Sequence, residues 1–258
     1  MKPYIIVIAN QKGGVGKSTA VDAIGSYIAS KGKRCLFIDL DPQGNLSYTM
    51  KANYSGISVP TAWEVLTQRA NLVDAIQRTE RGHIVASSPL LASADINLTM
   101  LGKEYRLKEA LKPILRQYDA IIIDTPPNLG ILTINALTAA NGCIIPSKTD
   151  IFSLQGILQL NKTIEAVKQY CNNPTLQILG IALSQYSSRT IIGKEIAAAL
   201  EQTAAALKTK LYNAKIRECT AIKEAAAKQE SIFVYAPKSN ASIDYQDLAE
   251  EALQGILF

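Results

Sequence analysis

Residues 10–19 read N-Q-K-G-G-V-G-K-S-T, a glycine-rich stretch that ends in the G-K-S of a phosphate-binding loop. Gly13, Gly14 and Gly16 have no Cβ, so backbone N–H groups there can surround a phosphate. In such a loop Lys17 reaches the β- and γ-phosphates, and Ser18 offers its hydroxyl to Mg²⁺. The chemistry predicted is therefore the binding of a nucleoside triphosphate with Mg²⁺.

The loop departs from the usual phosphate-binding pattern at its front. That pattern asks for glycine five residues before Gly16, where this chain has Gln11. The next residue, Lys12, gives the loop a second lysine. This lysine needs an explanation, because Lys17 already serves the bound phosphates.

Carboxylates follow two apolar runs elsewhere in the chain. F-I-D-L-D-P-Q-G-N (37–45) contains Asp39 and Asp41, and Y-D-A-I-I-I-D-T-P-P (118–127) contains Asp124. An apolar strand that ends in aspartate beside a phosphate-binding loop is the Walker B arrangement, in which the carboxylate holds Mg²⁺ directly or through water. Ligands of open α/β sheets bind at the carboxyl ends of the strands, where these side chains would meet.

The elements that must position these residues alternate between short apolar runs and longer helical patterns. Buried parallel strands are predicted at 4–9, 35–39, 120–124, 142–146 and 177–183. Helices are predicted at 17–31, 104–117, 131–141, 153–171 and 192–209. Residues 83–88 are a candidate strand, and residues 61–68 a candidate short helix. This order predicts one α/β domain over 1–258, a doubly wound, mostly parallel sheet with helices on both faces.

The composition sets limits on the function. The chain has 258 residues, 48% of them hydrophobic, and a net charge of +5, which permits nucleic acid as a partner without requiring it. Its four cysteines lack metal or redox spacing and are expected to be free thiols, and His83, the one histidine, is expected to be structural. Neither a signal peptide nor a membrane span is apparent, so a cytoplasmic protein is expected.

The three motifs together resemble the ParA/Soj/MinD family of partition ATPases. K-G-G-V-G-K-S-T, D-L-D-P-Q-G-N and I-I-I-D-T-P-P occur in that family's order and spacing, and the similarity runs almost from end to end. The resemblance implies a P-loop NTPase of the deviant Walker A type that binds ATP and Mg²⁺ and hydrolyses ATP slowly without a stimulating partner. The nucleotide-binding residues it implies are Lys12, Gly13, Gly14, Val15, Gly16, Lys17, Ser18 and Thr19.

The resemblance also implies how the site works. Lys12 would reach across an ATP-dependent homodimer to the partner's ATP, which agrees with the high cost of burying an unpaired cation in an interface. Asp41 would orient or activate the attacking water, so Lys12, Lys17 and Asp41 are the expected catalytic residues. Ser18, Asp39 and Asp124 would support Mg²⁺, and T-P-P-N (125–128) would begin a switch that senses the γ-phosphate.

Within the family, DNA segregation is the branch that the sequence favours. The last stretch, 242–258, has four acids and no lysine or arginine, unlike the basic amphipathic helix with which MinD-type proteins bind membranes. No membrane partner is therefore expected. A MinD-like ATPase that positions a protein or membrane-associated cargo is the alternative.

A basic segment supports the DNA-binding branch. Residues 186–238 contain nine Lys or Arg against five acids, a net of +4, which suits sequence-independent contacts with DNA phosphates. The family places a DNA-binding arginine where Arg189 stands. The expected contacts with nonspecific double-stranded DNA are Arg189, Lys215, Arg217, Lys223 and Lys228.

Two further expectations come from the resemblance. Many relatives have I-P-x-N where this chain has I-R-E-C (216–219), so Arg217 and Cys219 stand at positions that flank the adenine. The first strand begins near Lys2, so no N-terminal helix-turn-helix is expected. The sequence thus predicts a ParA-type ATPase for plasmid or chromosome partition. We expect it to bind DNA, and so to lie on the nucleoid, when ATP is bound. Hydrolysis of ATP, stimulated by a ParB-like partner, is expected to release it from the DNA.

Overall fold

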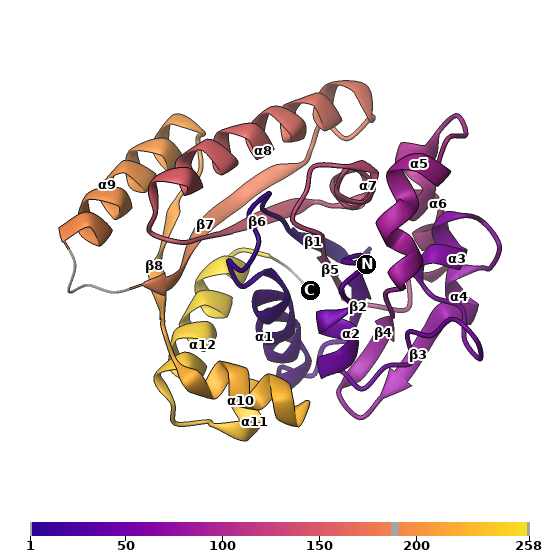
Figure 1. Cartoon of the computed structure of the whole chain (residues 1–258), viewed down its shortest axis with the longest axis horizontal. Coiled ribbons are helices and arrows are strands. Elements are labelled where there is room, and N and C mark those ends of the chain that lie inside the picture. Colours follow the sequence, from indigo (N-terminus) through magenta and orange to yellow (C-terminus); the bar gives the residue numbers. More distant parts are fainter. Residues whose placement is uncertain (1, 187–190, 257–258) are drawn as a thin grey trace.

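The computed structural model describes residues 2–186 and 191–256 of the chain (Figure 1). Within them, eight strands form one sheet in the order β3-β4-β2-β5-β1-β6-β7-β8. All neighbouring pairs are parallel except the β3–β4 hairpin at one edge. The predicted doubly wound α/β fold is confirmed.

The predicted strands are all present, and two further strands extend the sheet. The five predicted strands are β1 (Tyr4–Ile8), β2 (Cys35–Asp39), β5 (Ala120–Asp124), β6 (Gly142–Ser147) and β7 (Gln177–Tyr186). The candidate strand near residue 83 is β4 (Gly82–Val85). The edge strands β3 (Ile76–Thr79) and β8 (Leu211–Arg217) were not predicted.

Four of the long helices follow predicted segments, whereas the long C-terminal helix was not predicted. They are α1 (Lys17–Ser30), α7 (Ile131–Ala139), α8 (Ile151–Tyr170) and α9 (Ile191–Ala206), and the short helix α3 (Ala62–Leu66) is also confirmed. The predicted helix 104–117 is three short pieces, η2 (Lys103–Tyr105), α6 (Arg106–Leu111) and η3 (Lys112–Ile114), and Pro113 lies in the first turn of the last piece. The other helices are α2 (Asn45–Thr49), α4 (Leu72–Ala75), η1 (Pro89–Ser93), α5 (Ala94–Asn97), α10 (Thr220–Lys228), α11 (Ile232–Tyr235) and α12 (Asn240–Leu253).

Two apolar cores cover the two faces of the sheet. Ile5 and Val7 of β1 face the core formed with α3, α6, α7, α8 and α9, whereas Ile6 and Ile8 face the core formed with α1, α2 and α12. Strands buried on both faces are apolar throughout, which explains the continuous apolar runs. Within α1, Gly25 allows close packing, because a Cβ there would lie 2.2 Å from Cε1 of Phe37.

The C-terminal helix α12 packs onto the domain. Tyr245 and Leu248 are buried in the core shared with α1, and Glu251 accepts a hydrogen bond from the backbone of Asn213 on β8 (2.8 Å). No helix within residues 2–186 and 191–256 is long and apolar enough to cross a membrane. Three cysteines are buried free thiols and Cys219 is half-buried, while His83 Nδ1 hydrogen-bonds the Tyr118 hydroxyl (2.8 Å).

Candidate functional site

The glycine loop connects β1 to α1 at the carboxyl edge of the sheet. Gly14 and Gly16 have φ angles of 68° and 84°, in the left-handed region that only glycine adopts without strain. Gly16 is the residue immediately before α1, so the helix N-terminus, with its partial positive charge, faces the loop. The loop therefore has the backbone conformation of a phosphate cradle.

Asn10 fixes the front of this loop to the neighbouring strand. Its Nδ2 donates to the carbonyl of Pro146 on β6 (2.6 Å), and its Oδ1 accepts from the backbone N–H of Lys12 (2.9 Å). The Lys17 ammonium folds back along the loop and donates to the Lys12 carbonyl (3.0 Å). Burial lowers the pKa of Lys17, while the charges of Asp124 and Asp41 oppose that shift.

Asp124 ends β5 directly beneath the loop and is completely buried. Its Oδ1 accepts from the backbone N–H of Thr125 (3.0 Å), whereas its Oδ2 has no hydrogen-bond partner among the described residues. Burial, followed by the charge of Asp39, raises its pKa well above the usual range, and the nearby Ser18 hydroxyl opposes that rise. A buried carboxylate oxygen without a partner, beside a serine hydroxyl, fits a hard cation such as Mg²⁺.

Asp39 has a different environment, because both of its carboxylate oxygens are used within the protein. Oδ2 accepts from the Ser47 backbone N–H (2.8 Å) and hydroxyl (2.7 Å), and Oδ1 accepts from the Asp41 N–H (3.1 Å). Burial raises the pKa of Asp39 to about 6. Asp39 thus organises the loop that carries Asp41, and its expected part in holding Mg²⁺ stays a prediction.

Ser47 and Ser87 complete a buried network that the sequence did not reveal. The Ser47 hydroxyl accepts from the backbone N–H of Ser87 (2.9 Å), and the Ser87 hydroxyl donates to the Asp41 carbonyl (2.5 Å). Asp41 itself is nearly buried, its Oδ1 accepts from the N–H of Gln43 (3.0 Å), and burial raises its pKa. The position of Asp41 is therefore set by segments that follow β2 and β4.

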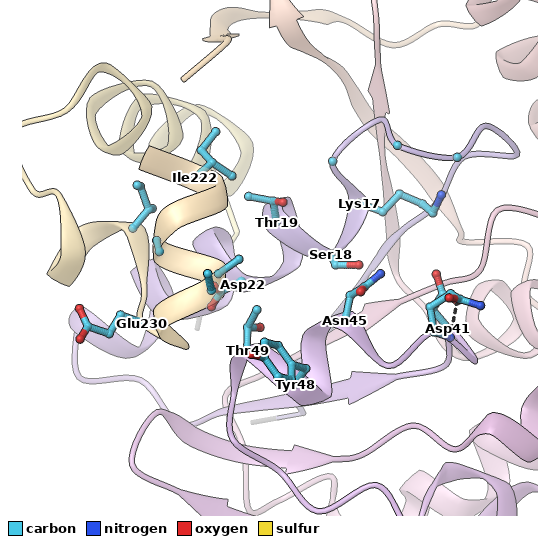
Figure 2. A pocket seen from close by; sticks show the side chains of 18 of the residues that line it. Lys17, Ser18, Thr19, Asp22, Asp41, Asn45, Tyr48, Thr49, Ile222 and Glu230 are labelled. Atoms are coloured by element: carbon cyan, nitrogen blue, oxygen red, sulfur yellow. Dashed lines mark hydrogen bonds between the residues drawn. The ribbon is translucent and has the colours of Figure 1, made fainter. Parts of the chain in front are cut away.

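A cavity of about 530 Å³ opens in front of the loop (Figure 2). Figure 2 shows Lys17, Ser18 and Thr19 on one side of it, and Asn45 and Tyr48 of α2 below. Helix α10 forms the opposite wall with Ile222 and three alanines, a contribution that sequence analysis missed. Phosphate-binding groups at one end and an apolar helix face at the other suit a nucleotide.

Arg217 and Cys219 are not among the residues that line this cavity. The Arg217 guanidinium is held by Asp244 of α12, with Nε to Oδ2 at 2.9 Å and Nη2 to Oδ1 at 2.6 Å. Cys219 is the N-cap residue of α10. Their expected contacts with the adenine therefore stay predictions, and the Arg217 charge is already compensated within the chain.

Lys12 forms an ion pair with Asp150 of its own chain. Asp150 lies in the turn after β6 and caps α8, because its Oδ1 accepts from the Ser153 N–H (3.1 Å). Both side chains of the pair are about one-third exposed, at 32% and 33%. The front lysine of the loop is therefore bound, in this structure, to a partner 138 residues away in the chain.

The predicted DNA-contacting residues lie along β8 and α10. Lys215, Lys223 and Lys228 are exposed, and the Lys215 ammonium lies over the Tyr186 ring at 5.0 Å. Tyr186 ends β7 just before residues 187–190, so the prediction for Arg189 lies outside the described residues. Lys215 lies on the edge strand β8, Lys223 and Lys228 lie on the helix α10 that follows it, and the contacts of these lysines with DNA stay predictions.

Known proteins are similar to this chain over nearly its whole length. A family model described as an AAA domain matches residues 3–178. The sporulation initiation inhibitor protein Soj of Bacillus subtilis is 36% identical over 256 residues, with 96% of this chain and 97% of Soj covered. The chromosome partitioning protein ParA of Caulobacter vibrioides is 35% identical over 254 residues, with 96% and 93% covered.

A solved structure supports the identity of the ligands. Cobyrinic acid a,c-diamide synthase of Mycobacterium smegmatis, crystallised with ADP and magnesium, is 32% identical, with 96% of this chain and 93% of that chain covered and a TM-score of 0.81. The same enzyme has also been solved with an ATP analogue and magnesium. These findings agree with the cradle, the cavity and the unpaired Asp124 oxygen, so ATP and Mg²⁺ are the ligands of this site.

Proposed function

The chain belongs to the ParA/Soj family of partition ATPases, and on that premise we propose how its residues let ATP control the binding of DNA. The observation that carries the proposal is the unpartnered, buried Oδ2 of Asp124, a carboxylate that lies near Lys17 and Ser18, and these two residues line a nucleotide-sized cavity. When bound there, MgATP supplies the γ-phosphoryl group that is transferred to water.

We assign each residue of the site a distinct role in ATP hydrolysis. Lys17 neutralises the β- and γ-phosphates, and Ser18 and Asp124 hold the cation. Asp41, fixed through its carbonyl by Ser87 and through its N–H by Asp39, orients the attacking water. Arg217 is bound to Asp244, so in this conformation it does not serve as an arginine finger that would stabilise the transition state. This agrees with slow ATP hydrolysis until a ParB-like partner binds.

Lys12 couples nucleotide binding to dimerisation. In a two-fold dimer the front of each glycine loop faces the other protomer's ATP, and the Lys12 ammonium exchanges Asp150 for those phosphates. ATP then becomes part of the interface, and hydrolysis followed by release of the phosphate removes the γ-phosphate that holds Lys12 there. The dimer therefore forms with ATP and dissociates after turnover.

Dimerisation doubles the number of exposed lysines available to DNA from β8 and α10, namely Lys215, Lys223 and Lys228. A single protomer offers few phosphate contacts, whereas two protomers on one duplex release about twice as many counterions and bind far more tightly. ATP would therefore place the protein on nucleoid DNA, and hydrolysis stimulated by a ParB-like, centromere-bound partner would release it. Repeated cycles of this kind move or position the DNA cargo.

Sedimentation velocity tests the ATP switch. We expect wild-type protein to be monomeric with ADP and dimeric with ATP, and Lys12→Ala to bind ATP while staying monomeric. Lys162→Ala is the matched control, because Lys162 is an exposed lysine on α8. A normal ATP-dependent dimer of Lys12→Ala would refute the proposed role of Lys12, and a wild-type protein that stays monomeric with ATP would refute the switch.

A further inference from the structure

A third lysine lies beside the glycine loop, although it is far from the loop in the sequence. Lys148 follows β6, in the short turn between Ser147 and the cap residue Asp150. Its Nζ lies 3.8 Å from the position that a Cβ would take on Gly14. The carbonyl of Gly14 accepts a hydrogen bond from Gln185 Nε2 (3.4 Å), so Gly14 has contacts with the turn that follows β6 and with the end of β7.

Among residues 2–186 and 191–256, no acidic side chain forms an ion pair with the Lys148 ammonium. The acid nearest to it in the sequence, Asp150, is already engaged by Lys12 and by the Ser153 N–H. The described part of the chain offers the Lys148 ammonium neither a hydrogen bond nor an ion pair. Two other lysine ammoniums near the loop do have partners, because Lys17 donates to the Lys12 carbonyl and Lys12 pairs with Asp150.

An unpaired, half-buried cation at a phosphate cradle attracts the ligand's charge. An ammonium group that is partly removed from water gains more from a phosphate oxygen than a fully exposed lysine would. The side chain of lysine is flexible enough to move a few ångströms from Gly14 onto a bound phosphate without a change in the backbone.

We propose that Lys148 is a nucleotide-binding residue of this ATPase, whose ammonium contacts the terminal phosphate of the ATP bound by its own chain. The proposal rests on the proposed function, because it assumes that the cradle binds ATP. In the proposed complex the helix N-terminus faces the inner phosphates and Lys17 reaches the β- and γ-phosphates, so Lys148 would add a second ammonium at the terminal phosphate. The additional negative charge of ATP over ADP is on the γ-phosphate, so Lys148 favours the triphosphate and helps the protein to distinguish it from the diphosphate.

Isothermal titration calorimetry with Mg²⁺ and either a non-hydrolysable ATP analogue or ADP tests this proposal. We expect Lys148→Ala to weaken binding of the ATP analogue by about tenfold, the loss of one charge-assisted hydrogen bond, and binding of ADP by about twofold or less. Lys148→Arg keeps the charge and should stay within about threefold of wild type. Lys162→Ala, on the following helix, should change neither affinity, and thermal unfolding without nucleotide checks that each variant is folded.

A second arm tests whether the contact is made within one chain. In a Lys12→Ala background, in which the proposed dimer does not form, Lys148→Ala should still weaken binding of the ATP analogue by about tenfold. Loss of the effect in that background would overturn the proposal, since the contact would then depend on the partner protomer. Unchanged affinity for the analogue, or equal losses for the analogue and ADP, would also overturn it. Wild-type protein that binds no ATP would instead refute the proposed function.

Discussion

The ion pair between Lys12 and Asp150 predicts that this protein restrains its own dimerisation. The Lys12 ammonium must leave Asp150 before it can reach the phosphates of the partner's ATP. Asp150→Asn removes the charge of the competing group and keeps an oxygen that can cap α8, because asparagine is as good an N-cap residue as aspartate. We therefore expect the variant to dimerise more readily with ATP.

The magnitude follows from the exposure of the pair. With both side chains about one-third exposed, the pair belongs with surface ion pairs, which contribute about 0.2–1 kcal/mol. Each dimer requires two such pairs to open, so the restraint amounts to about 0.4–2 kcal/mol. Because 1.4 kcal/mol is a factor of ten, the dimerisation constant should rise by about 2- to 30-fold in Asp150→Asn.

Sedimentation velocity with a non-hydrolysable ATP analogue, over a range of protein concentrations, measures that constant. Asp247→Asn is the control for loss of one negative charge, since Asp247 is exposed on α12. The gain should shrink at high salt, because salt already weakens a partly exposed pair. An Asp150→Asn dimer that is no tighter than wild type, or is weaker, would show that the pair does not compete with the dimer contact.

Three further predictions concern the carboxylates of the site. Asp41→Ala should keep ATP binding and dimerisation but lower the rate of ATP hydrolysis by at least about a hundredfold, so that the ATP-bound dimer accumulates. Hydrolysis near the wild-type rate would refute the role of Asp41 in orienting the attacking water. Ser47→Ala leaves the Ser87 N–H and Asp39 Oδ2 with fewer partners, so it should lower kcat about tenfold with little change in KM for ATP. Ser47→Thr keeps the hydroxyl and should restore most of the lost kcat. An equal loss of kcat in Ser47→Thr would contradict the role given to the Ser47 hydroxyl. Burial raises the pKa of Asp39 to about 6, so Asp39 takes up a proton as the pH falls through about 6, and burial together with the charge of Asp39 raises the pKa of Asp124 well above its usual range. Mg²⁺-dependent nucleotide binding should therefore weaken below that pH in calorimetric titrations from pH 8 to 5, and a midpoint near 4 would contradict the raised values.

The parts of the fold that the sequence predicted have local causes. Gly14 and Gly16 have positive φ angles, which favour glycine, and Asp39 and Asp124 end continuous apolar runs that are typical of buried parallel strands. The register Asp39↔Asp124 between β2 and β5 brings these two side chains together, because the carboxyl ends of neighbouring parallel strands lie at the same edge of the sheet.

The parts that were missed depend on long-range contacts or on weak local patterns. Strand β8 alternates buried and exposed residues at the edge of the sheet, so it lacks the apolar run of a central strand. The Ser47–Ser87 contact joins residues 40 apart, and the Lys12–Asp150 pair joins residues 138 apart. Serines, a lysine and an aspartate have no sequence pattern that would predict such pairs. The wall that α10 contributes to the cavity could be recognised only after β8 had placed that helix beside α2.

Binding to a random-sequence DNA duplex, measured with ATP, with ADP and without nucleotide across a salt series, tests the central claim most directly. We expect tight binding only with ATP, with an affinity that falls steeply as salt rises, because Lys215, Lys223 and Lys228 would contact phosphates. Replacing these three lysines together with alanine should weaken the binding and flatten its salt dependence. DNA binding that is equal in all three nucleotide states, or absent from all of them, would contradict the claim that ATP gates the binding of DNA.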